Sequence, residues 1–129
     1  MKFENLNRFA CVNDQNKNIL NKPHNQNVVY YSELRQCYTE NSFRSFSIKY
    51  TLEGTMFFKS QEKDYVVEQG QVLFTTKQPQ VKGILDYTEK PLKSVCIDIN
   101  DQTLGEVLTT LTINNDDVFD KLANGEYII

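Results

Sequence analysis

The stretch FSIKYTLEGTMFFKSQEKDYVVEQGQVLFTT, residues 46–76, determines how the fold of this chain is read. It contains four short runs of aromatic, aliphatic and β-branched residues, separated by Gly54, by the polar tetrapeptide QEKD and by Gly70. In the first run, apolar residues alternate with polar ones from Phe46 to Leu52, a period of two that is typical of a strand. Short strands at this regular spacing predict a mostly β fold, either a sandwich or a barrel.

Two further segments extend the predicted sheet on either side of this stretch. VVYYSEL at 28–34 and LKSVCIDI at 92–99 are rich in β-branched and aromatic residues, as strands are. The preceding residues 1–27 are polar and rich in asparagine, and we expect them to form an N-terminal arm with a short strand at about 9–12. The β domain itself is therefore expected to span residues 28–99.

The hydrophobic period changes after residue 99. Apolar residues then recur at i, i+3, i+4 and i+7, which predicts a helix over about 101–111. The motif NNDDVFDKLANG predicts a second short helix that ends at Gly125. The last residues, EYII, fit either a terminal strand or the cut end of a domain from a longer protein. We therefore expect one or two short helices within residues 100–129.

Length, composition and charge exclude several classes of protein. A chain of 129 residues is one domain by length, and 40% hydrophobic with 24% charged residues is ordinary for a soluble globule. The net charge of −3 gives no concentrated basic surface, so we expect this segment not to bind DNA itself. No run of about 20 apolar residues is present to span a membrane. Three scattered cysteines without a C-x-x-C pair indicate a reducing, cytoplasmic setting.

The segment YTLEGTMFFKSQEKDYVVEQGQVLFTT resembles a cupin barrel. Together with SVCIDINDQTLGEVLTTL, it is similar to the N-terminal sensor domain of AraC-type transcription regulators over about residues 28–112. The resemblance implies a cupin-like jelly-roll barrel that binds an unknown small-molecule effector, with the arm at 1–27 able to close over it. It also implies a homodimer paired through residues 100–129, and DNA contact only through a domain missing from this chain.

The residues do not provide the ligands that cupins use to hold a metal. Metal cupins follow G-x5-H-x-H-x3,4-E-x6-G, and anchoring the last glycine on Gly54 places Ser47 at the glutamate position. Anchoring the second cupin motif on Gly70 places Val81 at its histidine position, so at most Glu40 survives of four ligands. Divalent metals of this kind need three or four converging ligands. We therefore expect no metal and no cofactor.

No catalytic constellation is present in the sequence. The chain has one histidine, within the polar segment KPHNQ, which is more readily explained as a solvated loop residue than as a general base. No G-x-S-x-G, P-loop or H-E-x-x-H motif occurs. We therefore expect a protein that is not an enzyme.

The interior of the barrel is the expected ligand site. Two readings of the strand at 46–53 remain open, because alternation of apolar residues turns Tyr50 inward whereas the metal-cupin register turns Lys49 inward. Side chains that only fill a core are an equally good explanation of the aromatic residues. The candidate ligand-binding residues are the polar anchors Arg44 and Lys49 and the wall residues Tyr50, Phe57, Phe74 and Cys96.

The predicted helix has an aliphatic stripe that must be buried against something. Packing on its own barrel and pairing with a second subunit explain the pattern equally well, and the resemblance favours pairing. The expected dimer-interface residues are Leu104, Val107, Leu108 and Leu111.

Two other kinds of protein compete with a regulatory sensor domain. One is a stand-alone cupin-fold enzyme, such as an isomerase or a dioxygenase, which the missing metal ligands disfavour. The other is a jelly-roll module that binds a small molecule or a carbohydrate, which would not need the amphipathic helix.

Overall fold

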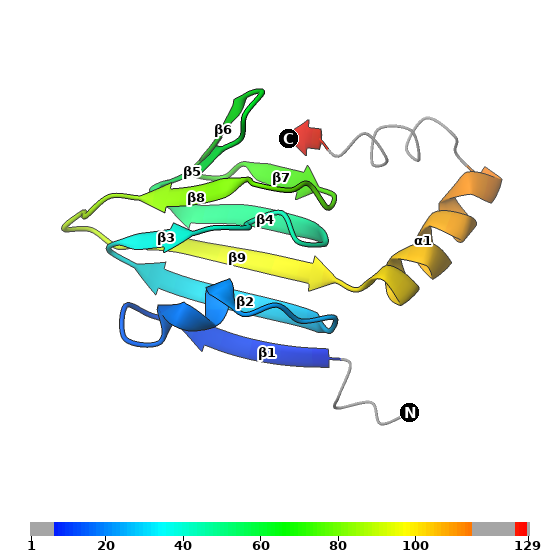
Figure 1. Ribbon diagram of the computed structural model, residues 1–129, viewed down its shortest axis with the longest axis horizontal. Helices are drawn as coiled ribbons and strands as arrows, with labels where there is room; N and C mark the ends of the chain where they lie inside the picture. The colour runs from blue at the N-terminus through cyan, green and yellow to red at the C-terminus, as the bar shows by residue number, and fades with distance from the viewer. Residues whose placement is uncertain (1–6, 115–125, 129) are drawn as a thin grey trace.

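The computed structural model describes residues 7–114 and 126–128. In these residues the strands are β1 Asn7–Val12, β2 Asn27–Leu34, β3 Cys37–Thr39, β4 Phe46–Glu53, β5 Thr55–Lys59, β6 Asp64–Glu68, β7 Val72–Thr75, β8 Lys82–Leu85, β9 Leu92–Ile99 and β10 Glu126–Ile128. They form a larger sheet in the order β1-β2-β9-β4-β7-β10 and a smaller one in the order β3-β8-β5-β6 (Figure 1).

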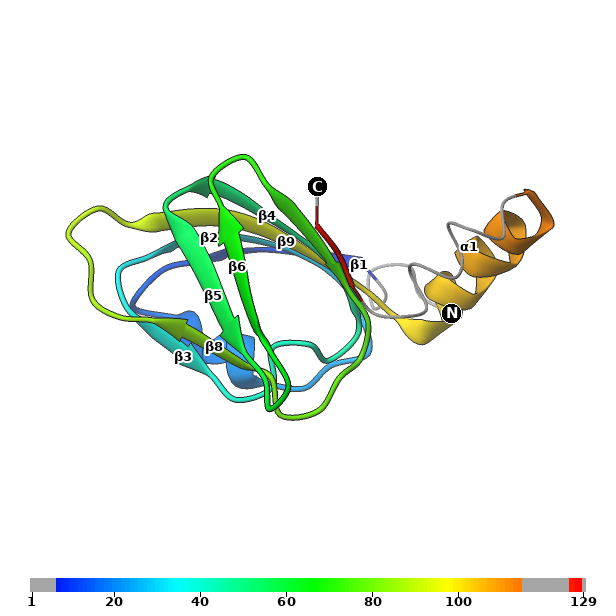
Figure 2. The ribbon, with the colours of Figure 1, turned by 90° about the horizontal axis from the view of Figure 1, so that it is seen from above.

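The two sheets face each other and curve toward a barrel, which is plain when the molecule is seen from above (Figure 2). Most sheet neighbours are antiparallel and far apart in sequence, as in β2 with β9 and β4 with β9. The prediction of a mostly β, jelly-roll-like fold followed by a helix is confirmed.

The stretch 46–76 forms four consecutive strands, β4 to β7, as its pattern predicts. The turns between them depend on glycine, because Gly54 has φ +89° and Gly70 has φ +84°. A residue with a Cβ rarely adopts this left-handed conformation, so both positions favour glycine. The chain then passes through QEKD to make the hairpin between β5 and β6.

The polar face of β4, and not its apolar face, points into the barrel. Ser47, Lys49 and Thr51 are at most 5% exposed, whereas Ile48 and Tyr50 are only half-buried. The reading that turned Tyr50 inward is therefore corrected, and the metal-cupin register holds. Two of the buried hydroxyls have partners inside the barrel: Ser47 Oγ is 2.8 Å from Thr75 Oγ1, and Thr51 Oγ1 donates to the Val67 carbonyl. Because these hydrogen bonds replace those with water, the polar residues tolerate burial.

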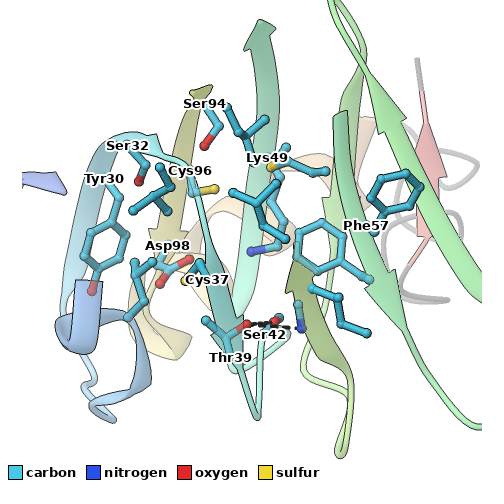
Figure 3. A pocket seen from close by; sticks show the side chains of 18 of the residues that line it. Tyr30, Ser32, Cys37, Thr39, Ser42, Lys49, Phe57, Ser94, Cys96 and Asp98 are labelled. Atoms are coloured by element: carbon cyan, nitrogen blue, oxygen red, sulfur yellow. Dashed lines mark hydrogen bonds between the residues drawn. The ribbon is translucent and has the colours of Figure 1, made fainter. Parts of the chain in front are cut away.

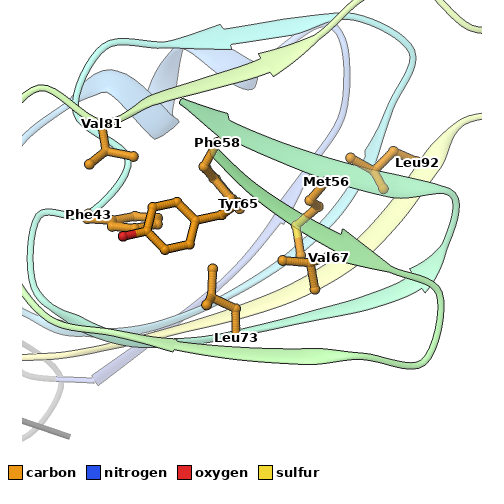
Figure 4. Packing of buried hydrophobic residues seen from close by; sticks show 8 residues of the cluster. All are labelled: Phe43, Met56, Phe58, Tyr65, Val67, Leu73, Val81 and Leu92. Carbon is orange, nitrogen blue, oxygen red and sulfur yellow. The ribbon is translucent and has the colours of Figure 1, made fainter. Parts of the chain in front are cut away.

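Apolar side chains from both sheets fill one part of the barrel. Phe43 lies at its centre, with its ring 5.2 Å from the rings of Phe58 and Tyr65. A second apolar cluster lies between β2, β3 and the end of β1, and Cys96 packs partly against both. The first cluster consists of Phe43, Met56, Phe58, Tyr65, Val67, Leu73, Val81 and Leu92 (Figure 4).

Residues 7–26, the described residues before β2, belong to the barrel wall. The strand expected at 9–12 is β1, which runs parallel to β2 at the edge of the larger sheet. The segment 13–26 follows, and it contains the 3₁₀ helix η2 (Lys17–Asn21). Asn21 of this helix donates to the Tyr38 carbonyl and accepts from the Glu40 amide, so the segment is fixed to β3 and the residues after it.

Helix α1 (Asp101–Asn114) follows β9 after one residue and extends away from the barrel (Figures 1 and 2). Asn100 caps it, because its Oδ1 accepts from the Thr103 amide at 2.8 Å. Asn27 at the start of β2 ties this end down by accepting from the Asn100 amide and donating to Thr103 Oγ1. The predicted helix is confirmed and runs three residues further than expected, whereas the second predicted helix lies outside the described residues.

The final strand, β10, pairs antiparallel with β7 at the edge of the larger sheet. Among the described residues, no helix combines the length and the apolar character needed to cross a bilayer.

An alanine at Gly83 should destabilise the protein. A Cβ added there would lie 2.8 Å from Ser42 Oγ and closer still to Thr39 Oγ1, two hydroxyls that bond to each other. Since Thr39 Oγ1 also accepts from the Gly83 amide, we expect overpacking to lower the free energy of unfolding by about 1–3 kcal/mol in urea titrations. Gly105→Ala is the matched control, because nothing lies within 4 Å of its added Cβ and alanine favours a helix. Equal losses in both variants would contradict this account.

Candidate functional site

A cavity of about 110 Å³ lies between the two sheets, beside the first apolar cluster (Figure 3). Side chains from β2, β4 and β9 form one wall, and side chains from β3, β5 and β8 form the other. Most of the lining is apolar, and the charged side chains Lys49 and Asp98 lie on the larger sheet. The lining residues on the larger sheet are Tyr30, Ser32, Leu34, Lys49, Leu92, Ser94, Cys96 and Asp98.

Lys49 carries a buried positive charge into this cavity. Its side chain is 5% exposed, and Nζ lies 5.7 Å from the centre of the Phe43 ring and 5.5 Å from that of Phe58. Within the described part of the chain, no carboxylate lies within ion-pair distance of this ammonium, and no hydrogen bond from it is present. Aromatic faces attract a cation only modestly, so they offset part of the cost of removing this charge from water.

Asp98 is the second buried charge of the cavity, and it is held by His24. His24 Nδ1 accepts from the Gln26 amide, which places the ring proton on Nε2, and Nε2 donates to Asp98 Oδ2 at 3.1 Å. Burial alone would raise the pKa of the Asp98 carboxyl. The hydrogen bond from His24 and the positive charge of Lys49 outweigh that effect, so the pKa lies below its ordinary value.

The segment 13–26 closes one side of the cavity. Leu20 contributes an apolar side chain to the lining, and Arg44, which also lines the cavity, donates from Nη1 to the Lys22 carbonyl at 2.5 Å. The His24–Asp98 bond is a second attachment of the same segment. Two charged side chains, Arg44 and Asp98, therefore hold the segment 13–26 against this side of the cavity.

Neutral hydroxyl groups complete the polar lining. Ser32 and Ser94 are neighbours across β2 and β9, and both are 4% exposed. Thr39 and Ser42 bond to each other on the opposite wall, beside Gly83. These groups both donate and accept, so they accommodate many polar ligand atoms without adding charge.

The two cysteines that line the cavity, Cys37 and Cys96, are not suited to act as nucleophiles. Burial raises the pKa of the Cys96 thiol and of the Cys37 thiol, so both stay protonated at neutral pH. Neither forms a disulfide. Both act as small apolar wall residues.

Four of the six residues predicted for the ligand site line the cavity: Arg44, Lys49, Phe57 and Cys96. Phe57 stands at its edge and is 49% exposed. Tyr50 and Phe74 are not part of the lining. Side chains alternate between the two faces of a strand, and Lys49 and Leu73 point inward, so Tyr50 and Phe74 point to the outer face of the larger sheet. The prediction that these two residues belong to the cavity wall is therefore corrected.

Asp98 lines the cavity, and His24, which is not part of the lining, bonds to it; the sequence did not lead us to either residue. The sequence carried a usable signal for Asp98. It follows Ser94 and Cys96 at every second position of β9, so the three side chains share one face of the strand. A charged residue on the inner face of a central strand is rare unless it has a partner. His24 had no such signal, because only the folded chain brings it to Asp98, 74 residues later.

No metal-ligating cluster of three or more His, Cys, Asp or Glu side chains occurs in the described parts of the chain, 7–114 and 126–128. The positions at which metal cupins carry a glutamate and a late histidine hold Ser47, which bonds to Thr75, and Val81, which is fully buried in the core. The residues present therefore do not fit a cupin metal.

The residues predicted for the dimer interface lie on α1. Leu104 is half-buried and Val107 is 47% exposed. The side chains of Leu108 and Leu111 lie outside the described residues. A Cβ added at Gly105 would meet nothing within 4 Å. At Gly105 and Val107, therefore, the barrel does not pack against α1.

No protein-family model and no curated protein sequence matches this chain. Several solved structures are similar to it, including two structures of ToxT. One is ToxT from Vibrio cholerae, with 12% identity and a TM-score of 0.48, over 67% of this chain and 34% of that one. The other is unsaturated-fatty-acid-bound wild-type ToxT from Vibrio cholerae strain SCE256, with 10% identity and a TM-score of 0.45, over 63% of this chain and 32% of that one. The chain thus spans about a third of the length of each. At these values the likeness does not assign a function.

Proposed function

We propose that this chain is the effector-sensing and dimerisation domain of an AraC-type transcription regulator, which binds a small molecule in a metal-free barrel. DNA is contacted through a further domain that is not part of this chain. The observation that carries the proposal is the cavity itself, which is lined by a lysine without a protein acceptor among the described residues, a buried aspartate and five hydroxyl-bearing side chains within mostly apolar walls. A barrel that served only as a scaffold would gain stability by filling this space with apolar side chains.

The route from the cavity to α1 is short, which suits a sensor. Strand β9 contributes Cys96 and Asp98 to the lining, and Asn100 alone separates it from the helix. Asn27 bonds to both Asn100 and Thr103, and β2, which begins with it, also lines the cavity through Tyr30. A ligand that shifts β2 against β9 therefore changes the orientation of α1 directly.

Binding in the cavity is tested by NMR titration of the ¹⁵N-labelled protein with a panel of compounds no larger than benzene. We expect saturable shifts for at least one compound, concentrated at the amides around Ser32 and Ser94. Ser94→Leu fills the cavity and should remove them, whereas Val95→Leu, on the outer face of the same strand, should not. Shifts that persist in Ser94→Leu, or no saturable shift with any compound, would contradict the proposed function.

Pairing through α1 is tested by placing a charge on its exposed stripe. In the proposed dimer, Val107→Lys buries an ammonium in an apolar interface, so we expect a folded monomer with its circular dichroism retained and its mass by light scattering halved. Gln102→Lys, an exposed position on the same helix, is the control and should remain dimeric. A wild-type protein that is monomeric at high micromolar concentration would contradict the dimer.

A further inference from the structure

We infer that the ligand of this cavity is a compact organic monoanion, whose carboxylate pairs with the Lys49 ammonium and whose apolar body fills the space beyond it. The inference rests on the proposed function, since it names the class of molecule that the cavity takes. It depends on three features of the cavity: the sign of its unpaired charge, the number of such charges and the size of its apolar part.

The sign follows from Lys49. Its side chain is 95% buried, it points into the cavity, and in the described residues it has only two aromatic rings as close partners (Figure 3). No side-chain nitrogen or oxygen of the described residues is both fully buried and without a partner, so Lys49 Nζ, which has no acceptor there, must keep its accessible surface toward the cavity. A buried lysine that faces an internal space in this way is ready to pair with a group placed in that space. An anion is the partner that suits it, and the serine hydroxyls of β2 and β9 line the same cavity.

The number of charges follows from Asp98 and Arg44. The Asp98 carboxylate lines the same cavity and is close enough to Lys49 for the ammonium to lower its pKa. A second negative charge on the ligand would therefore meet repulsion. The Arg44 guanidinium keeps its positive charge while it donates to the neutral Lys22 carbonyl, so Lys49, Arg44 and Asp98 together leave one net positive charge in the lining. One net negative charge on the ligand suits this arrangement, and a phosphate dianion or a dicarboxylate does not.

The size follows from the volume and the walls. The cavity of about 110 Å³ is smaller than an engineered apolar cavity of about 150 Å³ that accepts benzene. The walls away from Lys49 are mostly apolar, and a sugar ring with its hydroxyls is larger than benzene, so it exceeds this volume even though Thr39 and Ser42 place hydroxyls on the wall opposite the larger sheet. The apolar wall residues are Leu34, Met56, Phe58, Ile84, Leu85 and Leu92. A short-chain or small-ring monocarboxylate fits, whereas a long acyl chain requires the segment 13–26 to move away.

Butyrate and butyramide test the inference, because they have nearly the same shape and differ in charge. Isothermal titration calorimetry of the full chain should give a dissociation constant about 10- to 100-fold lower for butyrate, the range of a hydrogen bond to a charged group. Lys49→Met should remove this preference, and Lys49→Gln serves if the methionine variant does not fold. Lys59→Met, an exposed lysine on β5, is the matched control and should keep the preference. Octanoate and succinate should both bind less tightly than butyrate.

Three results would overturn the inference. They are equal binding of butyramide and butyrate, a preference for butyrate that survives in Lys49→Met, and no binding of butyrate at all. In each case the titration with neutral compounds no larger than benzene decides the proposed function separately, because it requires the cavity but not the charge. Saturable shifts there, together with any of these three results, would leave a sensor of neutral ligands.

Discussion

Replacing Lys49 with methionine should raise the free energy of unfolding of the ligand-free protein by about 1–3 kcal/mol. Methionine has a similar volume, and replacing a buried charge with a well-packed apolar side chain often stabilises a protein by about this amount. The variant loses the contacts of Nζ with the Phe43 and Phe58 rings and the attraction to Asp98, which offset part of the gain. Urea unfolding at neutral pH measures the difference.

Lys59→Met is the control for this stability measurement as well. Lys59 is exposed on β5, so we expect its replacement to change the free energy of unfolding by less than about 0.5 kcal/mol. A gain in stability specific to position 49 would mean that the fold retains a destabilising charge, as functional sites commonly do. A large loss in Lys49→Met would instead assign Lys49 a structural role and would contradict the ligand site.

Replacing Asp98 with asparagine should make the free energy of unfolding fall less steeply as the pH is lowered, which flattens the acid limb of the curve of stability against pH. The pKa of the folded Asp98 lies below its ordinary value of 3.8, so the unfolded chain takes up this proton more readily than the folded one. The charged form therefore stabilises the fold above about pH 4, and this contribution is lost as the pH falls through the folded pKa. Asp98→Asn removes the charge at every pH, so we expect it to cost about 1–3 kcal/mol at pH 7 and little at pH 2.

The control for this prediction is Asp64→Asn, which removes an exposed carboxylate on β6. We expect this variant to keep the acid limb of the wild type. Thermal melts from pH 2 to pH 7 compare the three proteins. Parallel curves for wild type and Asp98→Asn would show that Asp98 and its bond to His24 do not stabilise the fold.

The strands of the barrel could be predicted because their signal is local. Each strand of 46–76 ends at a glycine or a polar hairpin, and Gly54 and Gly70 take the left-handed conformations that such turns use. The helix after the barrel was equally clear from its period. The pairing of β1 with β2 and of β4 with both β7 and β9 had no local signal, because these contacts join distant parts of the chain.

The inner face of β4 shows why the site was only partly predictable. The alternation of apolar and polar residues along β4, taken alone, predicts that the more apolar residues, including Tyr50, point inward. The barrel reverses it, because Ser47 and Thr51 find partners on neighbouring strands and Lys49 faces a cavity. Polar groups that have hydrogen-bond partners are tolerated inside a protein, but those partners are known only from the fold. The same holds for the pairing of His24 with Asp98.

A crystal structure of the protein grown with saturating butyrate tests the central claim most directly. The account predicts butyrate inside the barrel, with a carboxylate oxygen about 2.7–2.9 Å from Lys49 Nζ and the alkyl chain directed toward Leu85 and Met56. Butyrate bound only outside the barrel, or in the barrel with its carboxylate turned away from Lys49, would contradict it.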